Sequence, residues 1–181
     1  MAARPIDFYF DFSSPYSYIA SEWIEALAAR HGRTVSWRAI LLGATFQHTE
    51  LRSPVDYPVK REYTMLDFER SARFAGVPLK IPAKFPIPTQ NAARLFWWLQ
   101  QRGDLTASHW ARHCLRAFFA RGVDLSDPAA LASMRDGLAV LLAAATRATL
   151  LRLYPEAAAA FDAIPDGEAR ESAQPPGQPP R

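Results

Sequence analysis

The sequence predicts an α/β fold that opens with a strand, a helix and a second strand and continues as a mostly helical segment. Two observations support this prediction. Residues 6–12 read I-D-F-Y-F-D-F, with an apolar residue at every second position and an aromatic residue in between, which is typical of a strand. After Ser13, Ser14 and Pro15 the apolar spacing becomes helical, which predicts a helix from Tyr16 to Gly32.

The following segments extend this pattern. Residues 34–42 read T-V-S-W-R-A-I-L-L and predict a second strand, parallel to the first because a helix-length segment separates the two. Helical spacing then predicts helices over residues 58–75, 89–102, 105–121 and 128 to about 154. The link over residues 76–88 contains four prolines, which favour extended irregular backbone.

The composition fits one compact domain. The chain has 181 residues, of which 49% are hydrophobic, so it can bury a single core. We expect a domain over residues 1–163 and a disordered tail over 164–181, where the sequence ends in polar residues, proline and glycine. The net charge is only +3, and basic and acidic residues are mixed, so no nucleic-acid partner is indicated.

The cysteine content and the N-terminus indicate the cytoplasm. Cys114 is the single cysteine, which excludes an internal disulfide and an intrachain redox dithiol and fits a reducing compartment. The first residues lack the uninterrupted apolar core of a signal peptide. No stretch of about 18 apolar residues suggests a membrane span, so no membrane partner is expected.

The sharpest local feature is the segment Ser14-Pro15-Tyr16-Ser17, at the exit of the first strand and the entrance of the first helix. The first turn of a helix presents free backbone N–H groups and a partial positive charge, which favour an anion such as a thiolate. Two simpler interpretations stay open: Ser14 only caps the helix, or Ser13 is the cap. A hydrolase-type serine is disfavoured because no G-x-S-x-G motif surrounds it.

Several motifs resemble one family in its own order. Residues 7–18, D-F-Y-F-D-F-S-S-P-Y-S-Y, resemble the opening of 2-hydroxychromene-2-carboxylate isomerases, relatives of kappa-class glutathione transferases in the DsbA-like branch of the thioredoxin superfamily. The resemblance continues through residues 37–46, 58–78, 84–87 and 117–128. It implies a thioredoxin-like βαβ core with a DsbA-like helical insertion at about residues 44–150.

The resemblance also implies a function and a site. It implies a glutathione-dependent cis-trans isomerase of the 2-hydroxychromene-2-carboxylate type in aromatic catabolism, with a small aromatic substrate and a homodimeric state like that of relatives. Ser14 would be the catalytic residue beside the glutathione sulfur, and Pro15, Lys60 and Tyr63 would help to bind glutathione or the substrate carboxylate. For Lys60 and Tyr63 a solvated helix face stays open as an alternative. A kappa-like glutathione transferase is the alternative enzyme.

One departure from the family pattern gives a third alternative. In the family a G-V-P-T-like segment with a cis proline, two strands and a final helix complete the sheet, and after Leu151 this sequence has no such pattern. We therefore expect the C-terminal strands of the sheet to be missing. A sheet left with free edges would be poorly stable, so the chain could be a truncated, non-enzymatic remnant.

The remaining candidate residues receive no catalytic role. His109 and His113 lie one helical turn apart but lack a third ligand, so no metal site is expected. His48 falls in a loop after the second strand, and nothing in the sequence fixes its role. Trp98 is expected in the core, and Cys114 is expected as a small buried apolar residue.

Overall fold

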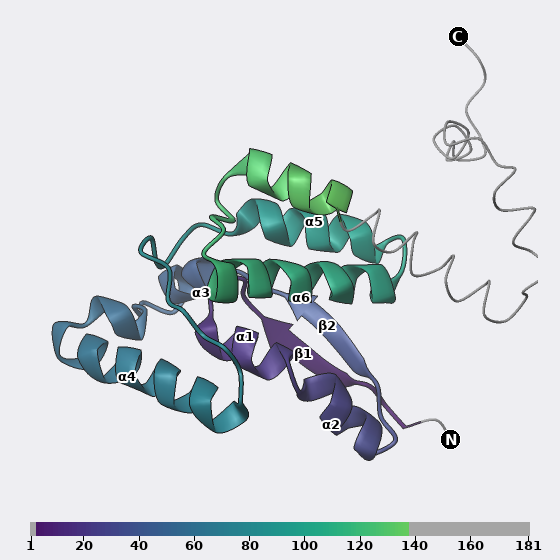
Figure 1. The fold of residues 1–181 in the computed structure, drawn as a ribbon, viewed down its shortest axis with the longest axis horizontal. Coiled ribbons are helices and arrows are strands. Elements are labelled where there is room, and N and C mark those ends of the chain that lie inside the picture. Colours follow the sequence, from purple (N-terminus) through teal and green to yellow (C-terminus); the bar gives the residue numbers. More distant parts are fainter. Residues whose placement is uncertain (1–2, 138–181) are drawn as a thin grey trace, which may run out of the picture. The chain divides into compact units, whose positions relative to one another are not determined.

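The computed structural model describes residues 3–137 (Figure 1). Residues 128–137 are helical. The predicted domain boundary at residue 163, the tail over 164–181 and the end of the last predicted helix lie outside these residues. The elements follow in this order: β1 (Ile6–Phe10), α1 (Pro15–Ser21), α2 (Ile24–Arg30), β2 (Val35–Ala39), α3 (Leu42–His48), the short 3₁₀ helix η1 (Pro54–Asp56), α4 (Pro58–Ala75), α5 (Gln90–Gln100) and α6 (Asp104–Arg121).

The opening of the chain forms the predicted parallel pair of strands. β1 and β2 pair in register from Ile6 opposite Val35 to Phe10 opposite Ala39. Both strands are shorter than the apolar patterns suggested, because the chain turns away after Phe10 and after Ala39. These two strands make up the sheet within the described residues. The predicted loss of later strands concerns residues beyond 137, outside the described part of the chain.

The sheet has one covered face and one open face. Phe10 is fully buried on the covered face, where its ring lies 5.4 Å from Trp37 and 5.3 Å from Phe96. Helices α2, α5 and α6 contact β2. On the opposite face Tyr9 is 63% exposed, and Asp7 forms an ion pair with Arg38 at 3.4 Å. The core therefore lies between the sheet and the helices that contact β2.

The predicted single helix from Tyr16 to Gly32 is wrong, because the structure divides it into α1 and α2. At the break the amide of Glu22 donates to the carbonyl of Ile19, and the amide of Trp23 donates to that of Ala20, so the turn tightens to three-residue spacing. The Ser21 hydroxyl donates to the Tyr18 carbonyl at 2.6 Å, which competes with the helical pattern.

Two ion pairs fix the broken helix against α6. Glu22, at the break, accepts two hydrogen bonds of 2.7 Å from Arg116. Glu25 of α2 accepts one of 2.6 Å from Arg112 and a second, of 3.0 Å, from the indole of Trp37 in β2. The bidentate pair favours one fixed geometry, so these contacts hold the break in place between α6 and the sheet.

The later helices confirm the predicted pattern. α4, α5 and α6 agree with their predicted bounds within two residues, and the backbone from residue 77 to 89 is irregular as expected. Within this link the Phe85–Pro86 peptide bond is cis. α4 and α6 both end at a glycine with positive φ, Gly76 and Gly122, which is the usual left-handed helix stop.

Three details correct or confirm the expectations for single residues. His48 is the last residue of α3 and does not lie in a loop. The prediction missed this helix because seven residues are too few to show a helical apolar spacing. Trp98 is 44% exposed and not in the core, and the guanidinium of Arg102 lies 3.5 Å above its ring. Cys114 is fully buried, as predicted.

The aromatic core can be tested by comparing neighbouring rings of β1. Phe10→Ala should lower the free energy of unfolding by about 3–5 kcal/mol, because it removes a fully buried ring and leaves a cavity. The matched variant Tyr9→Ala, on the open face, should change it by less than about 1 kcal/mol. Urea unfolding of both variants measures the difference, and equal losses would contradict this assignment of the two faces.

Candidate functional site

The candidate site begins where β1 ends and α1 starts. Ser14 occupies the N-cap position with extended backbone (φ −101°, ψ 115°), and Pro15 is the first helical residue. The Ser14 hydroxyl accepts a hydrogen bond of 3.2 Å from the amide of Ser17. Ser14, and not Ser13, is therefore the cap, and its side chain is half-buried.

After capping the helix, the Ser14 hydroxyl can still form further hydrogen bonds. A hydroxyl has two acceptor lone pairs and one donor hydrogen, and the bond from Ser17 uses one lone pair. Pro15 has no N–H, and the amide of Tyr18 donates to the Ser14 carbonyl at 3.0 Å. Within residues 3–137 the Tyr16 amide has no acceptor, so this amide and the Ser14 hydroxyl hydrogen are the donors at the helix entrance. This pair of donors suits an anion.

A buried carboxylate holds the turn that presents Ser14. Asp11 lies just after β1, and its Oδ1 accepts a bond of 2.6 Å from the amide of Ser13. Its Oδ2 accepts a bond of 2.7 Å from the amide of Leu42, the first residue of α3. The hydroxyl of Thr89, the N-cap of α5, donates to Oδ1 at 3.4 Å. Asp11 therefore connects three separate segments beneath the site.

The environment of Asp11 changes its acidity. Burial disfavours the charged form and raises the pKa of this carboxyl above its ordinary value, while the bonds from Ser13, Leu42 and Thr89 oppose that rise. Sequence analysis did not select Asp11 as a functional residue. Its one signal is an acidic residue in an otherwise apolar run, directly before the Ser-Ser-Pro turn.

The proline-rich link is attached to the same turn. The Ser13 hydroxyl accepts a hydrogen bond of 3.2 Å from the amide of Ile87, so the link passes beside the start of α1. Earlier in the link, Lys84 pairs with Asp124 at 2.8 Å, and the Lys80 amide donates to the Phe119 carbonyl at 2.7 Å. The two neighbouring serines therefore have different tasks: Ser13 anchors the link and Ser14 caps the helix.

α4 contacts α1 through a tyrosine and a carboxylate. The Tyr16 hydroxyl donates to Asp67 at 2.6 Å, and its ring lies 5.0 Å from that of Phe68. Burial is the main cause that raises the pKa of Tyr16 to about 12, followed by the bond and charge of Asp67 and by nearby Tyr63. The hydroxyl therefore stays protonated at neutral pH. Neither Tyr16 nor Asp67 was selected from the sequence.

The structure places the other predicted site residues as follows. Pro15 is buried at the start of α1. Lys60 and Tyr63 lie in the first two turns of α4 and are exposed. The Lys60 ammonium lies 4.9 Å from the ring centre of Tyr57. Among the described residues, no side-chain hydrogen bond joins Lys60 or Tyr63 to Ser14, whose hydroxyl is bonded to the Ser17 amide. The helix that carries them is joined to α1 by the hydrogen bond between Tyr16 and Asp67.

The histidines do not assemble a second site in the part of the chain that the structure describes. Over residues 3–137 no group of three or more histidine, cysteine or acidic side chains is arranged to hold a metal ion. His113 is partly buried, and burial lowers the pKa of its imidazole. None of the described helices combines the length and the apolar content that crossing a membrane requires.

Comparison with known proteins defines the family. Residues 5–153 match the DSBA-like thioredoxin domain family, and the chain belongs to that family. It is 31% identical over 137 residues to a 2-hydroxychromene-2-carboxylate isomerase of Pseudomonas putida, which covers 73% of this chain and 65% of the relative. It is 40% identical over 81 residues to glutathione S-transferase kappa 1 of Caenorhabditis elegans, covering 44% of this chain and 36% of the relative.

A solved structure supports the same fold. The structure of a 2-hydroxychromene-2-carboxylate isomerase superposes with a TM-score of 0.64 and 27% identity, over 74% of this chain and 64% of the other. These findings confirm the predicted resemblance and the thioredoxin-like fold with its DsbA-like helical part. The chain spans about two thirds of the length of the isomerases that it matches.

The role of Asp11 predicts an effect of pH on stability. Asp11→Asn should lower the free energy of unfolding by about 1–3 kcal/mol, because an amide cannot accept from both backbone donors. In the wild type the pKa of Asp11 is higher in the folded protein than in the unfolded chain. Protonation of Asp11 therefore stabilises the fold at low pH, and this stabilisation is lost as the pH rises through the pKa of the folded protein. Urea unfolding at several pH values between acidic and neutral should therefore show that the difference in free energy of unfolding between the wild type and Asp11→Asn becomes smaller as the pH rises. A difference that grows with pH would contradict the raised pKa of Asp11.

Proposed function

We propose that the chain acts as a glutathione-dependent isomerase on a 2-hydroxychromene-2-carboxylate or a similar small aromatic substrate, with Ser14 holding the glutathione sulfur. The observation that carries this proposal is the unused hydrogen of the Ser14 hydroxyl beside the unused Tyr16 amide at the helix entrance. Together with the partial positive charge of the first turn, these donors fit a thiolate. The similarity to two named isomerases supports the reaction class.

The residues of this chain would contribute binding and orientation. Bound glutathione would supply a thiolate that adds reversibly to the conjugated double bond, which then rotates as a single bond and re-forms on elimination, so no glutathione is consumed. Ser14 would donate a hydrogen bond to the sulfur and lower the pKa of its thiol. Lys60, whose ammonium forms no ion pair within the described residues, would attract a carboxylate of glutathione or substrate.

A kappa-like glutathione transferase is the second candidate. The observation that favours it is the 40% identity to a kappa-class transferase over 81 residues. The two activities share the thiolate and differ in its fate, since a transferase leaves the sulfur bonded to the product. Assays of isomerisation and of conjugation to an electrophilic aryl halide separate them, because only the second consumes glutathione in proportion to product.

Glutathione binding tests the alternative that the chain is not an enzyme. A ligand that binds the native state raises the midpoint of thermal unfolding. Millimolar glutathione should therefore stabilise this chain if the site is competent. No shift, together with no turnover, would favour a non-enzymatic chain and overturn the proposed function.

Ser14→Ala should lower glutathione-dependent turnover on the order of a hundredfold, because a charge-assisted hydrogen bond to the sulfur is lost. The ultraviolet absorbance of the bound thiolate should titrate at a higher pH in the variant. Ser36→Ala, which removes a hydroxyl from the second residue of β2, is the control and should retain activity. Unchanged turnover in a folded Ser14→Ala protein would refute the role of Ser14.

Lys60→Gln should raise the KM for glutathione or substrate about tenfold and leave kcat nearly unchanged, because the lysine would attract the bound carboxylate in the ground state and the transition state alike. The exposed Lys80→Gln on the proline-rich link is the matched control with the same loss of charge. Steady-state kinetics with each reactant varied in turn identify which carboxylate is held. Equal KM values for both variants would support the solvated-face alternative.

A further inference from the structure

A groove lies between the end of β2, α3 and α5, and Ser14 is not among the residues that line it. Its volume is about 680 Å³, which is within the range of small-molecule sites. We call it the β2 groove. The side formed by α5 and its C-cap carries residues at intervals of three and four, so they share one helix face: Gln90, Arg94, Trp97, Trp98 and Gln101.

The three walls of the β2 groove are fixed to one another by hydrogen bonds. Asp11 accepts from the amide of Leu42, where α3 begins, at 2.7 Å, and from the hydroxyl of Thr89, the N-cap of α5, at 3.4 Å. The indole of Trp97 in α5 donates to the carbonyl of Ala39 in β2 at 3.2 Å. The groove therefore has its shape before a ligand binds, which lowers the cost of ordering it on binding.

Two indole rings give the β2 groove an aromatic surface. Trp97 is 41% exposed and Trp98 is 44% exposed. The bond to β2 holds the Trp97 ring, which also packs edge-on against Phe96 with 5.4 Å between the ring centres. The guanidinium of Arg102 lies 3.5 Å from the ring centre of Trp98. Rings held in this way can stack on a planar aromatic ligand with little further loss of side-chain freedom.

An arginine and a backbone amide supply donors for an anion. Arg94 is the one charged residue among the described residues that line the groove, and within residues 3–137 it forms no ion pair. Its guanidinium donates to the side chain of Asn91 at 3.3 Å, which leaves most of its N–H groups available. The Leu41 amide has no acceptor in the described part of the chain. It points away from β1, because the amide of Ile40 before it donates to Phe10 of β1 and amides alternate along extended backbone.

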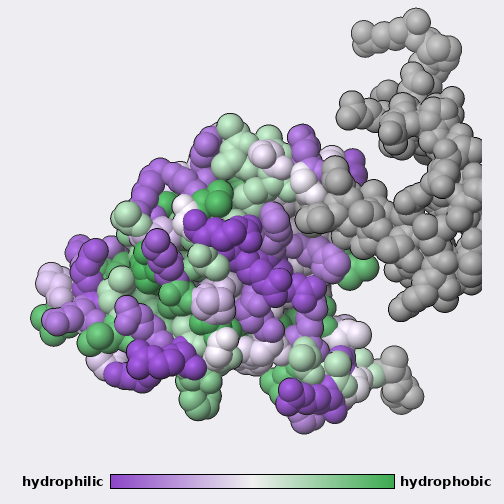
Figure 2. Space-filling view, in the orientation of Figure 1, coloured by the Kyte–Doolittle hydropathy of each residue, from purple (hydrophilic) through white to green (hydrophobic). Residues whose placement is uncertain are grey.

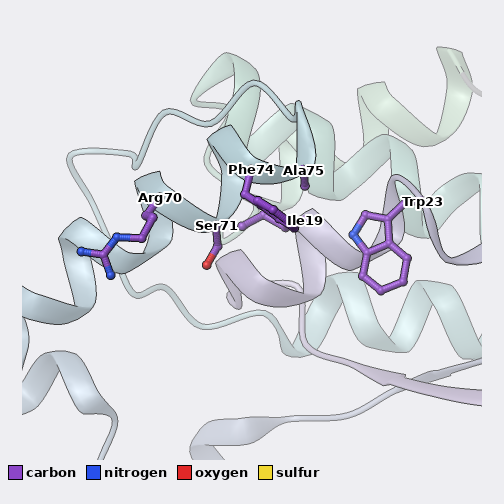
Figure 3. A pocket seen from close by; sticks show the side chains of 6 residues that line it. All are labelled: Ile19, Trp23, Arg70, Ser71, Phe74 and Ala75. Carbon is purple, nitrogen blue, oxygen red and sulfur yellow. The ribbon is translucent and has the colours of Figure 1, made fainter.

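A groove beside α4 differs in its charge. It lies between α4 and the α1–α2 break and is mostly apolar, and Figure 2 shows apolar side chains reaching the surface over α4. In Figure 3 the side chain of its one cation, Arg70, extends away from Phe74 and Trp23. The Arg70 guanidinium is already paired with Asp67 at 3.2 Å. Among the described residues that line this second groove, none therefore offers an unpaired charge to a ligand.

We propose that the β2 groove binds a planar aromatic carboxylate, at a site separate from the candidate site at the start of α1. The aromatic ring would stack on Trp97, and the carboxylate would accept from the Arg94 guanidinium, with the Leu41 amide as a second donor. One cation matches the single charge of a carboxylate, whereas a phosphate monoester carries nearly two charges at neutral pH. The side-chain amides of Gln90 and Gln101 line the same groove and can bond to polar groups on the ring. This inference does not depend on the proposed function.

Isothermal titration calorimetry of the full chain with 2-naphthoate tests this proposal. The wild type should bind this probe, and it should bind the neutral analogue 2-naphthamide about tenfold more weakly, because the bond to a charged partner is lost. Arg94→Gln should raise the Kd for 2-naphthoate about tenfold and leave the Kd for 2-naphthamide nearly unchanged. The matched control is Arg73→Gln, an exposed arginine of α4 outside the groove, which should bind like the wild type. No binding of 2-naphthoate by the wild type, or equal effects of the two arginine variants, would overturn the proposal.

Two further variants separate the β2 groove from the candidate site. Ala44→Trp, at an exposed position of α3 that lines the groove, should fill it without a change of charge and abolish binding of both probes. Far-ultraviolet circular dichroism shows whether each variant is folded, and this variant carries the test if Arg94→Gln is not. Lys60→Gln, which removes a cation from the proposed glutathione site, should leave the Kd for 2-naphthoate unchanged. Binding that is lost in Lys60→Gln but kept in Arg94→Gln and Ala44→Trp would place the probe beside Ser14 and overturn the proposal.

Discussion

The buried Asp11 carboxylate is the contact on which the site depends. Three segments meet at it: the turn before α1, the start of α3 and the start of α5. Two of its partners are backbone amides of half-buried residues, Ser13 and Leu42, which would otherwise lack this acceptor, and unpaired polar groups away from water are costly. An apolar residue at this position could fill the space but could not satisfy these donors. The carboxylate therefore fixes the backbone directly before Ser14.

The same arrangement explains why capping and anion binding by Ser14 are compatible. The capping bond uses a lone pair of the hydroxyl, while an anion would use its hydrogen. Ser13 makes a separate contact, since its hydroxyl accepts from the Ile87 amide and so anchors the proline-rich link. The contacts therefore decide which of the two serines is the cap, while anion binding by Ser14 stays a proposal.

The sequence predicts the regular elements well and the site contacts poorly, and the reason is physical. α4 and α6 are long, periodic and ended by glycine, so their signals are local. The partners of Asp11 in α3 and at α5 lie 31 and 78 residues away, and Tyr16 reaches an aspartate 51 residues away. No local pattern encodes such pairings. The break at Glu22 was missed for the same reason, because Arg116 holds it from 94 residues away.

α4 is joined to the start of α1 through Tyr16. The Tyr16 hydroxyl donates to Asp67 at 2.6 Å, and its ring lies 5.0 Å from that of Phe68, so one side chain contacts two successive residues of α4. A helix that is held by a hydrogen bond and by ring packing at the same place has less freedom to slide or to rotate than one held by apolar packing alone. These contacts therefore restrict the position of Lys60 and Tyr63, which lie on the same helix, relative to Ser14. The geometry of the candidate site depends in this way on a pairing between residues 51 positions apart.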